Sequence, residues 1–363
     1  RPQISDRAPS RVQSTRPVHC PTDNSTQCIM HSDMLSQGVR SRLELPQIGM
    51  GFAPLGALLE AVTSADASET FASALAGGIT YFDTAPFYGF GLSERRVGDA
   101  IRDHPNCILS TKVGRLLAKG AWDNPSEHGW PAALPFHHIY DYSYDGVMRS
   151  YEDSLQRLGM DRIDLLFLHD IGSFAHTDPD EESRHFKDAM SGGYRALDEL
   201  RQNGDIKAVG IGVNEIDVSL RALEHGNWDY FLLAGRYTLL EQDAMAELFP
   251  TCEKSETSII VGGPYNSGIL VGGKTWNYAD APEHIAKKVA NIKDVCQRHQ
   301  VPMAAAALQF CSAHRVVKSV IPGVRTAREM QQTLEWMDIA IPSELWADLK
   351  SNNLLDADVP TPS

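Results

Sequence analysis

The sequence predicts an α/β fold in which eight parallel strands close into a single (β/α)8 TIM barrel with long βα loops at the C-terminal face. Two observations predict it. Short apolar runs alternate along the chain with amphipathic stretches, which is typical of a parallel sheet covered by helices. Eight such units occupy roughly 290 residues, which suits a closed barrel better than an open sheet.

The expected strands are short runs rich in branched and aromatic residues, and several are apolar along most of their length, as strands buried on both faces are. They cover residues 45–51, 79–85, 107–113, 164–170, 208–213, 230–235, 258–263 and 319–323. The glycine-rich segment GMGFAPLG near the first run has the wrong spacing for a Rossmann fingerprint. No Rossmann dinucleotide site is therefore expected.

Amphipathic stretches separate the expected strands, and the clearest cover residues 68–76, 93–102, 145–158 and 282–299. In the third, Val147, Tyr151, Leu155 and Leu158 fall on one helical face. Two insertions, at about residues 116–144 and 171–191, interrupt the alternation. Both follow expected strand ends, on the side of a barrel where long loops usually shape the substrate site.

One folded domain is expected over residues 41–350, between two tails. Residues 1–40 are rich in Ser, Pro, Gln and Arg with little apolar periodicity, which is typical of a disordered segment. An organelle-targeting segment is the alternative, because four arginines lie among serines, although Asp6, Asp23 and Asp33 argue against it. Residues 351–363 are expected to form a polar C-terminal tail.

Composition limits the partners. The net charge of −14 argues against a broad nucleic-acid surface, and no apolar run approaches the length of a membrane span. The six cysteines show no CxxC pair, so we expect a reducing compartment and a cytoplasmic protein. His137 and His138 adjoin each other without an HExxH motif, so no metal site is expected. A small-molecule substrate is the expected partner, and the oligomeric state is left open.

Four polar residues fall at or just after the C-terminal ends of three expected strands, and these ends open onto one mouth of a barrel. They are Asp83, Tyr88, Lys112 and His169. A phenol beside an ammonium is a candidate proton donor and acceptor, because the cation lowers the phenol's pKa. Asp83 can hold Lys112 in place, and a neutral His169 can donate a hydrogen bond to a substrate oxygen. The set suits proton transfer to a carbonyl or from an alcohol.

Each of these residues also has a structural interpretation. Asp83 could cap the next helix, Tyr88 could pack on the rim, and a single histidine such as His169 is more often structural than catalytic. Lys112 is the exception, because it ends a strand that otherwise looks buried. The functional interpretation depends on all four residues occurring together.

Four segments carry a resemblance to a known family: ITYFDTAPFYGFGLSERRVG, STKVGRLL, DGVMRSYEDSLQRLGMDRIDLLFLHD and SVIPGVRTAREMQQ. They resemble the aldo-keto reductase superfamily over about residues 43–350. Within it, the pattern is most similar to the aldose 1-dehydrogenases of L-fucose, D-threo-aldose, L-galactose and D-arabinose, and to the related pyridoxal 4-dehydrogenase. The resemblance implies that Asp83, Tyr88, Lys112 and His169 are the catalytic tetrad and that a nicotinamide cofactor lies extended across the barrel mouth.

The same resemblance implies cofactor-binding positions, with departures from the family pattern. The polar pair after the fifth strand is Val213 and Asn214, so Asn214 carries the contact to the nicotinamide amide. The usual glutamine on the sixth strand is Ala234, and the aromatic residue after the seventh is Gly262. Tyr265 is a candidate replacement for that aromatic ring. As a structural alternative, Asn214 is a turn residue.

The segment IPGVRTARE resembles the family's adenosine-phosphate segment and implies that Gly323, Arg325, Thr326 and Glu329 bind the cofactor. Gly323 lets the backbone approach a phosphate, and a helix N-terminus favours anions. The Glu329 carboxylate would repel a 2′-phosphate and could accept a hydrogen bond from a ribose hydroxyl, which favours NAD over NADP. Alternatively, Glu329 is a solvated first-turn residue placed by the helix dipole.

The sequence therefore predicts an NAD(P)-dependent oxidoreductase that oxidises an aldose at C1 to the aldonolactone. Two enzymatic alternatives share this chemistry, a pyridoxal 4-dehydrogenase and a general aldehyde or ketone reductase. A third alternative is a cofactor-binding regulatory subunit, against which the intact set of four residues argues.

Overall fold

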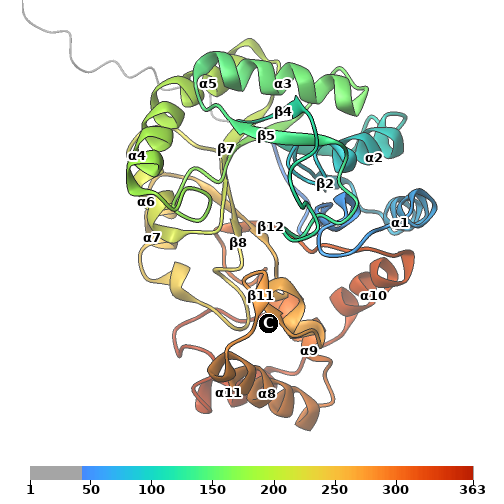
Figure 1. The fold of residues 1–363 in the computed structure, drawn as a ribbon. Helices are drawn as coiled ribbons and strands as arrows, with labels where there is room; N and C mark the ends of the chain where they lie inside the picture. The colour runs from blue at the N-terminus through green and yellow to red at the C-terminus, as the bar shows by residue number, and fades with distance from the viewer. Residues whose placement is uncertain (1–42, 363) are drawn as a thin grey trace, which may run out of the picture. The chain divides into compact units, whose positions relative to one another are not determined.

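The computed structural model describes residues 43–362 and contains the expected barrel (Figure 1). Eight parallel strands form one sheet in the order β1 (Met50–Gly51), β2 (Tyr81–Asp83), β3 (Ile108–Val113), β6 (Leu165–His169), β7 (Ala208–Val213), β8 (Tyr230–Ala234), β9 (Ser258–Gly262) and β12 (Val317–Ile321). Its edges meet through parallel bridges from Ile48 to Val320 and from Gly51 to Gly323. The predicted α/β barrel is confirmed.

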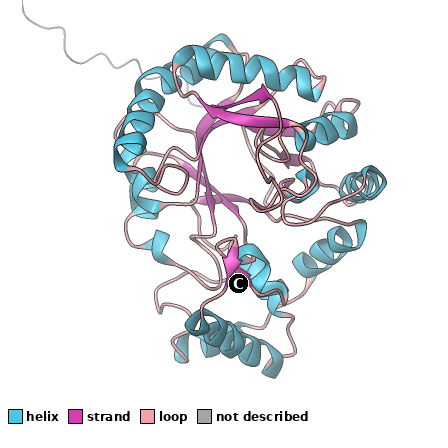
Figure 2. Ribbon diagram, viewed as in Figure 1, coloured by secondary structure: helices cyan, strands magenta, loops and turns pink. Residues whose placement is uncertain are grey.

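Helices surround the strands on the outside of the barrel (Figure 2). They are α1 (Ser64–Ala76), α2 (Leu92–Ile101), α3 (Tyr144–Leu158), α4 (Pro179–Asp188), α5 (Tyr194–Asn203), α6 (Ile216–Leu223), α7 (Leu248–Lys254), α8 (Glu283–Arg298), α9 (Met303–Phe310), α10 (Ala327–Asp338) and α11 (Ser343–Ser351). Shorter turns are η1 (Pro54–Gly56), η2 (Ala189–Gly193), η3 (Asp243–Met245) and η4 (Asn266–Val271). None of the helices within residues 43–362 is long and apolar enough to cross a membrane.

All eight expected strands are present, but the first, second and last differ most in extent. β2 is confined to Tyr81–Asp83 within the expected 79–85. Only Met50–Gly51 forms β1, whereas the expected run began at residue 45. Pro46 has no backbone N–H to donate to a ladder, which is consistent with a later start. β12 begins at Val317, earlier than expected, and pairs with β9 across a register shift between Val317 and Ser319.

Two apolar layers hold the barrel, because successive strand residues point alternately inward and outward. The barrel interior is filled by Tyr81, Leu165, Phe167, Ala208, Tyr230, Leu232, Ile260 and Ile321. The larger layer between strands and helices contains most of the remaining buried apolar residues. Within the described part of the chain, four cysteines are buried as free thiols, at Cys107, Cys252, Cys296 and Cys311.

The ends and the buried face of α3 follow from its sequence. The Ser143 hydroxyl accepts a hydrogen bond from the Gly146 N–H at its start, and Gly159 ends it with a φ of 62°. Of the predicted face, Val147, Tyr151 and Leu158 are buried, while Leu155 is half-buried. The predicted helix is therefore one residue longer at its start and packs as expected.

The two insertions contain ordered structure that the sequence did not predict. The first forms an antiparallel hairpin of β4 (Arg115–Lys119) and β5 (Phe136–Tyr140). The second contains α4, whose N-cap Asp178 accepts hydrogen bonds from the backbone N–H groups of Asp180 and Glu181. Its acidic residues therefore occupy a helix N-terminus, where the helix dipole favours them.

The C-terminal segment differs from the polar tail expected at residues 351–363. Leu354, Leu355 and Val359 are buried in the outer apolar layer. The Lys350 ammonium donates a 2.7 Å hydrogen bond to the Val359 carbonyl. The folded domain therefore continues beyond residue 350, because these three side chains remove apolar surface from water. The tail expected at residues 1–40 lies outside the described residues.

We predict that Arg157→Met lowers the free energy of unfolding by about 3 kcal/mol. The fully buried Glu94 carboxylate of α2 accepts hydrogen bonds from Arg157 of α3 and from the Thr111 hydroxyl, so removing the arginine leaves a buried charge without its cation. Arg149→Met on the same helix is the matched control, because its 3.8 Å pair with Asp153 is exposed, and should change stability by less than about 0.5 kcal/mol. Urea denaturation measures both, and equal losses would contradict the assignment.

Candidate active site

Three neighbouring strands bring their polar ends together at one mouth of the barrel. Asp83 ends β2, Lys112 is the penultimate residue of β3, and His169 ends β6. Each of the three side chains is at least 90% buried. The strands pair in parallel in the order β2, β3, β6, so their C-terminal ends lie side by side as the sequence argument required.

Tyr88 reaches the same place from the loop after β2. Its ring lies with its centroid 5.9 Å from that of His169, nearly perpendicular to it, and 4.6 Å from the Lys112 ammonium. Two glycines fix this loop. A Cβ on Gly56 would lie 2.7 Å from the Tyr88 carbonyl, and Gly89 has a φ of 64°, so a side chain at Gly56 would displace Tyr88 and one at Gly89 would be strained.

A buried ion pair joins Lys112 and Asp83. The Lys112 ammonium lies 2.7 Å from Asp83 Oδ2 and donates a second hydrogen bond, of 2.9 Å, to the Thr84 carbonyl. Asp83 Oδ1 accepts a 2.7 Å hydrogen bond from the Ser110 hydroxyl, which is itself 3.0 Å from the Tyr81 hydroxyl. The carboxylate is thus held from both sides. Sequence reasoning missed Ser110 and Tyr81, although both lie two residues from a predicted site residue.

Burial and charge act against each other on these groups. Burial would lower the pKa of Lys112, but the Asp83 carboxylate and the Tyr88 phenol outweigh it, so the pKa is raised and the ammonium stays charged. Burial raises the pKa of Tyr88, and Lys112 only partly opposes this. The sequence argument expected a lowered phenol pKa. That expectation is wrong in net direction, because desolvation of the phenolate outweighs the cation.

His169 is neutral in this environment. Burial, then the Arg115 guanidinium and then the Lys112 ammonium hold its pKa well below the usual value of 6.5. A neutral imidazole carries one N–H that can donate and one nitrogen that can accept. The site can therefore offer an uncharged hydrogen-bond donor beside a phenol, as the sequence argument supposed.

A second buried ion pair lies beside His169, and sequence reasoning missed it. Arg115, the first residue of β4, pairs through Nη2 with Asp170 Oδ2, and the same carboxylate oxygen lies 3.4 Å from His169 Nε2. The guanidinium also lies 4.1 Å from the Phe87 ring centroid and 5.2 Å from that of Tyr140. The sequence did carry a signal for this pair, because two predicted site residues are each closely followed by a charged one. Arg115 follows Lys112 in KVGR, and Asp170 follows His169 in LHD.

A cavity of about 540 Å³ opens in front of these residues. Its inner end contains Tyr88, Lys112, His169 and Asp170, and both insertions contribute to its wall. Aromatic rings dominate that wall: Trp130 stacks on Tyr88 with ring centroids 6.1 Å apart, and Phe87, Phe174 and Tyr278 also line it. A flat or ring-shaped molecule suits such walls.

A second cavity, of about 400 Å³, extends from Tyr88 to the start of α10. Four of the five residues expected to bind a cofactor line it, namely Asn214, Gly323, Arg325 and Glu329. The fifth, Thr326, is instead the N-cap of α10, where its hydroxyl accepts the Glu329 N–H at 3.1 Å. The two cavities share Tyr88, Asn214 and Tyr278.

Glu329 has a structural role as well as a place in this cavity. Its Oε2 accepts a 2.7 Å hydrogen bond from the Arg325 backbone N–H, so Thr326 and Glu329 together satisfy the first turn of α10 much as a capping box does. The Arg325 guanidinium turns toward the loop after β1, with Nε 3.6 Å from a Glu60 carboxylate oxygen. Glu329 is therefore a first-turn residue of α10, as its structural interpretation from the sequence stated.

The departures from the family pattern leave open space in the second cavity. Ala234, Gly262 and Tyr265 all line it. A Cβ on Gly262 would lie only 3.1 Å from Leu232 Cδ2, so no aromatic side chain fits there without a shift. Tyr265 is buried with its ring edge-on to Trp336, the centroids being 5.9 Å apart.

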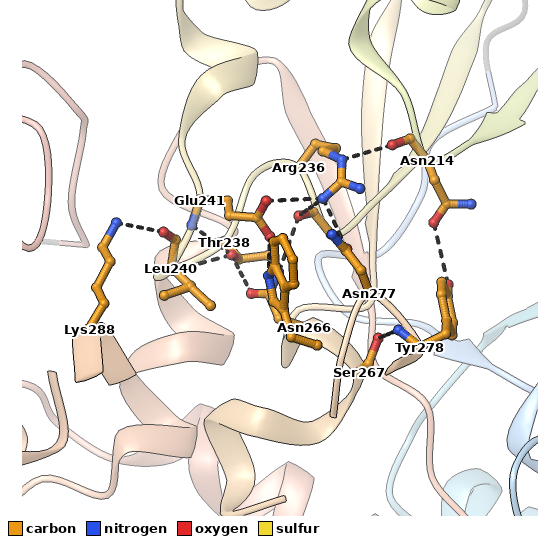
Figure 3. Close-up of polar contacts among 12 residues, drawn as sticks. Asn214, Arg236, Thr238, Leu240, Glu241, Asn266, Ser267, Asn277, Tyr278 and Lys288 are labelled. Carbon is orange, nitrogen blue, oxygen red and sulfur yellow. Dashed lines mark hydrogen bonds and ion pairs between the residues drawn. The ribbon is translucent and has the colours of Figure 1, made fainter. Parts of the chain in front are cut away.

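A hairpin of β10 (Thr275–Trp276) and β11 (Ala279–Asp280) has its tip in the lining of both cavities. Polar contacts tie this tip to the barrel (Figure 3). Arg236 donates hydrogen bonds to the Asn277 side chain at 3.1 Å, to Glu241 at 3.0 Å and to the Asn214 carbonyl at 2.8 Å. The Tyr278 hydroxyl donates to the Asn214 amide oxygen at 3.4 Å. Arg236 therefore links the tip of the hairpin to Asn214, which lines both cavities.

The histidines of the first insertion lie among aromatic rings. His138 contacts the rings of Phe87 and Trp122 edge-on, with centroids 5.0 and 5.1 Å apart, and His128 stacks on Trp122 at 4.1 Å. Within residues 43–362, no group of three His, Cys, Asp or Glu side chains is placed to hold a metal ion. These histidines pack the wall of the first cavity and its surroundings.

Comparison with known proteins gives the class to which this barrel belongs. The Aldo/keto reductase family model matches residues 47–353. The chain belongs to the aldo/keto reductase family, whose members are enzymes that use nicotinamide cofactors.

Two relatives cover almost the whole domain. Pyridoxal 4-dehydrogenase from Microbacterium luteolum is 42% identical, over 87% of this chain and 96% of that protein. D-threo-aldose 1-dehydrogenase from a Pseudomonas species is 35% identical, over 88% and 96%. Among solved structures, the holo form of an aldo-keto reductase from Bacillus halodurans is 25% identical and superposes with a TM-score of 0.65, over 89% and 96%. The resemblance stated from the sequence is confirmed.

We predict that His138 makes the protein less stable as the pH falls below about 6.5. Burial, then the Arg115 charge, lowers the pKa of His138 to about 4, whereas the unfolded chain has the ordinary value of about 6.5. Between these two values the unfolded state binds the proton more tightly, so acid favours unfolding. From pH 7 to pH 5 this group should account for a loss of about 1–2 kcal/mol.

Urea denaturation of His138→Gln at both pH values checks this prediction. The variant should lose less stability between pH 7 and pH 5 than the wild type does. The exposed His284, changed to Gln, is the matched control and should keep the wild-type pH dependence. Identical pH dependence in the wild type and His138→Gln would contradict the prediction.

Proposed function

We propose that this chain is an NAD-dependent dehydrogenase that oxidises the hemiacetal carbon of a cyclic hydroxy-aldehyde to a lactone, with Tyr88 as proton acceptor. The observation that carries the proposal is the set of residues at the barrel mouth, where the half-buried Tyr88 lies beside the buried Lys112 ammonium and a buried, neutral His169. Aldoses and pyridoxal both exist as cyclic hemiacetals. The names of the two relatives therefore describe one type of reaction.

In this proposal each residue has a separate task. The neutral His169 donates a hydrogen bond to the reacting oxygen and orients it. Tyr88 takes the hydroxyl proton, and the Lys112 ammonium stabilises the phenolate that forms. Asp83 holds Lys112 charged and in place through their 2.7 Å contact. In reduction, Tyr88 returns the proton to the same oxygen.

The second cavity is the proposed site of the dinucleotide. It connects Tyr88 with the N-terminus of α10, and small residues, Gly262, Gly263 and Gly323, line it where larger side chains would fill it. When bound there, the nicotinamide supplies the carbon that exchanges hydride with the substrate. Asn214 is the residue proposed for the amide, and Arg325 and Glu329 are those proposed for the adenosine end.

The two candidate substrates are an aldose and pyridoxal. The sequence argument put an aldose first, and the relative acting on D-threo-aldose supports it. The wall of Phe87, Trp130, Phe174 and Tyr278, together with the 42% identity to the pyridoxal enzyme, favours pyridoxal. An aromatic heterocycle gains more than a sugar from stacking on such rings. We therefore place pyridoxal first and an aldose oxidised at C1 second.

The test is an initial-rate assay of the purified protein with NAD and NADP against pyridoxal, L-fucose, D-arabinose and L-galactose. We predict turnover of pyridoxal or of an aldose, and a fall of at least about 100-fold in kcat for Tyr88→Phe, because general acid–base catalysis is lost. Cofactor affinity, measured by fluorescence titration, should stay within about threefold.

Tyr144→Phe on the outer helix α3 is the control, and it should keep wild-type rates. If Tyr88→Phe keeps a near-normal rate, Tyr88 is not the proton acceptor. If the wild type binds cofactor but turns over none of these compounds, the proposed reaction is wrong, and the regulatory-subunit alternative becomes the better explanation.

We predict that Glu329→Arg shifts the ratio of kcat/KM for NADP to that for NAD upward by about tenfold or more. The present carboxylate would face a 2′-phosphate with like charge, and a guanidinium would attract it. Because Glu329 also accepts the Arg325 N–H, Glu329→Gln is included, since it removes the charge but keeps an acceptor. It should give a smaller shift in the same direction, and unchanged ratios in both variants would exclude Glu329 from cofactor choice.

A further inference from the structure

We propose that Asp170 binds a second hydroxyl of the substrate, on the carbon next to the reacting carbon or one carbon further away, and so selects hydroxy-aldehydes over simple aldehydes. The inference rests on the proposed function, in which Tyr88 and His169 hold the reacting oxygen. Asp170 follows His169 directly and lines the same end of the 540 Å³ cavity.

The backbone holds Asp170 in an unusual conformation. Its φ is 46°, in the left-handed region that residues other than glycine seldom adopt. The Asp170 N–H donates to the Gly212 carbonyl at 2.9 Å, and the Tyr142 hydroxyl donates to the Asp170 carbonyl at 3.1 Å. These contacts fix the residue at the turn out of β6, so that its side chain stays at the inner end of the cavity.

The Asp170 carboxylate keeps acceptor capacity. An ionised carboxylate offers about four acceptor positions. Among residues 43–362, Arg115 makes the one short contact to it, at Oδ2. His169 Nε2 and the Asn214 amide lie at 3.4 Å from Oδ2 and Oδ1 respectively, which is too long for strong hydrogen bonds. Arg115 thus anchors one side of the carboxylate, and the other side can accept a substrate O–H.

The other groups at this end of the cavity explain why a hydroxyl is the matching partner. In the proposed reaction the Tyr88 phenol and the His169 imidazole both contact the reacting oxygen, and the Lys112 ammonium serves Tyr88. The hydrogen of a neighbouring hydroxyl needs an acceptor, and Asp170 is the carboxylate beside His169. Glu127, the other carboxylate in the described lining, is exposed. An aldehyde without that hydroxyl would leave the Oδ1 side of the buried carboxylate without a short hydrogen bond, which a polar site penalises strongly.

The test compares two three-carbon aldehydes that differ by their hydroxyls, glyceraldehyde and propionaldehyde, as substrates for reduction by NADH. For the wild type we expect kcat/KM to favour glyceraldehyde by about 10- to 100-fold, as a hydrogen bond to a charged group implies. Asp170→Asn keeps the shape and removes the charge, and it should lower this ratio about tenfold. Glu127→Gln removes a charge from the same cavity and should leave the ratio unchanged.

The ratio separates recognition from a merely structural role. If Asp170→Asn slows both aldehydes equally, Asp170 only positions His169 or Arg115, and the inference is overturned. A wild-type ratio below about threefold overturns it without any variant, so the test still decides if Asp170→Asn fails to fold. Failure of the wild type to reduce either aldehyde also overturns the inference, because glyceraldehyde carries the hydroxyl that Asp170 would select. The proposed function is judged separately, by turnover of pyridoxal and the aldoses, and turnover with an unchanged ratio in Asp170→Asn does not contradict it.

Discussion

The buried ion pair between Lys112 and Asp83 is the interaction on which the arrangement of the site depends. Both side chains are almost wholly buried, and the 2.7 Å contact joins the ends of β2 and β3. Removing either partner would leave an uncompensated buried charge, which typically costs about 3–5 kcal/mol. The Ser110 hydroxyl and the Thr84 carbonyl complete the hydrogen bonding of the pair. With the ammonium fixed in this way, Tyr88 has a cation beside its ring.

A second buried ion pair, between Arg115 and Asp170, lies next to His169 in the same site. His169 lies in contact with this pair, and the charges of Arg115 and Lys112 both oppose its protonation. The imidazole is therefore held neutral first by burial and then by two cations, each of which is paired with a carboxylate. The hairpin that carries Arg115 and the turn that carries Asp170 both belong to the long segments after strands, so loops and strands contribute jointly to one electrostatic site.

Much of the fold could be predicted, because it depends on local pattern. The alternation of apolar runs with amphipathic stretches gave all eight strands, and the face of α3 followed from its helical spacing. The hairpin β4–β5 was missed, since its strands contain His137 and His138 and lack a clear apolar alternation. The C-terminal segment was missed because Leu354, Leu355 and Val359 are isolated apolar residues in a polar stretch. Their burial depends on a surface made by other parts of the chain.

The sequence by itself determined the barrel, the family, the positions of Asp83, Lys112 and His169 at strand ends and that of Tyr88 in a loop after a strand, because strand order and strand polarity already place such residues at one mouth. Only the tertiary structure determined how easily these side chains gain or lose a proton. The net rise in the pKa of Tyr88 and the neutrality of His169 arise from burial and from charges brought close by folding. The pairing of Arg115 with Asp170, 55 residues apart in the chain, likewise required three-dimensional proximity, because electrostatic interactions depend on distance and solvent exclusion rather than on sequence order.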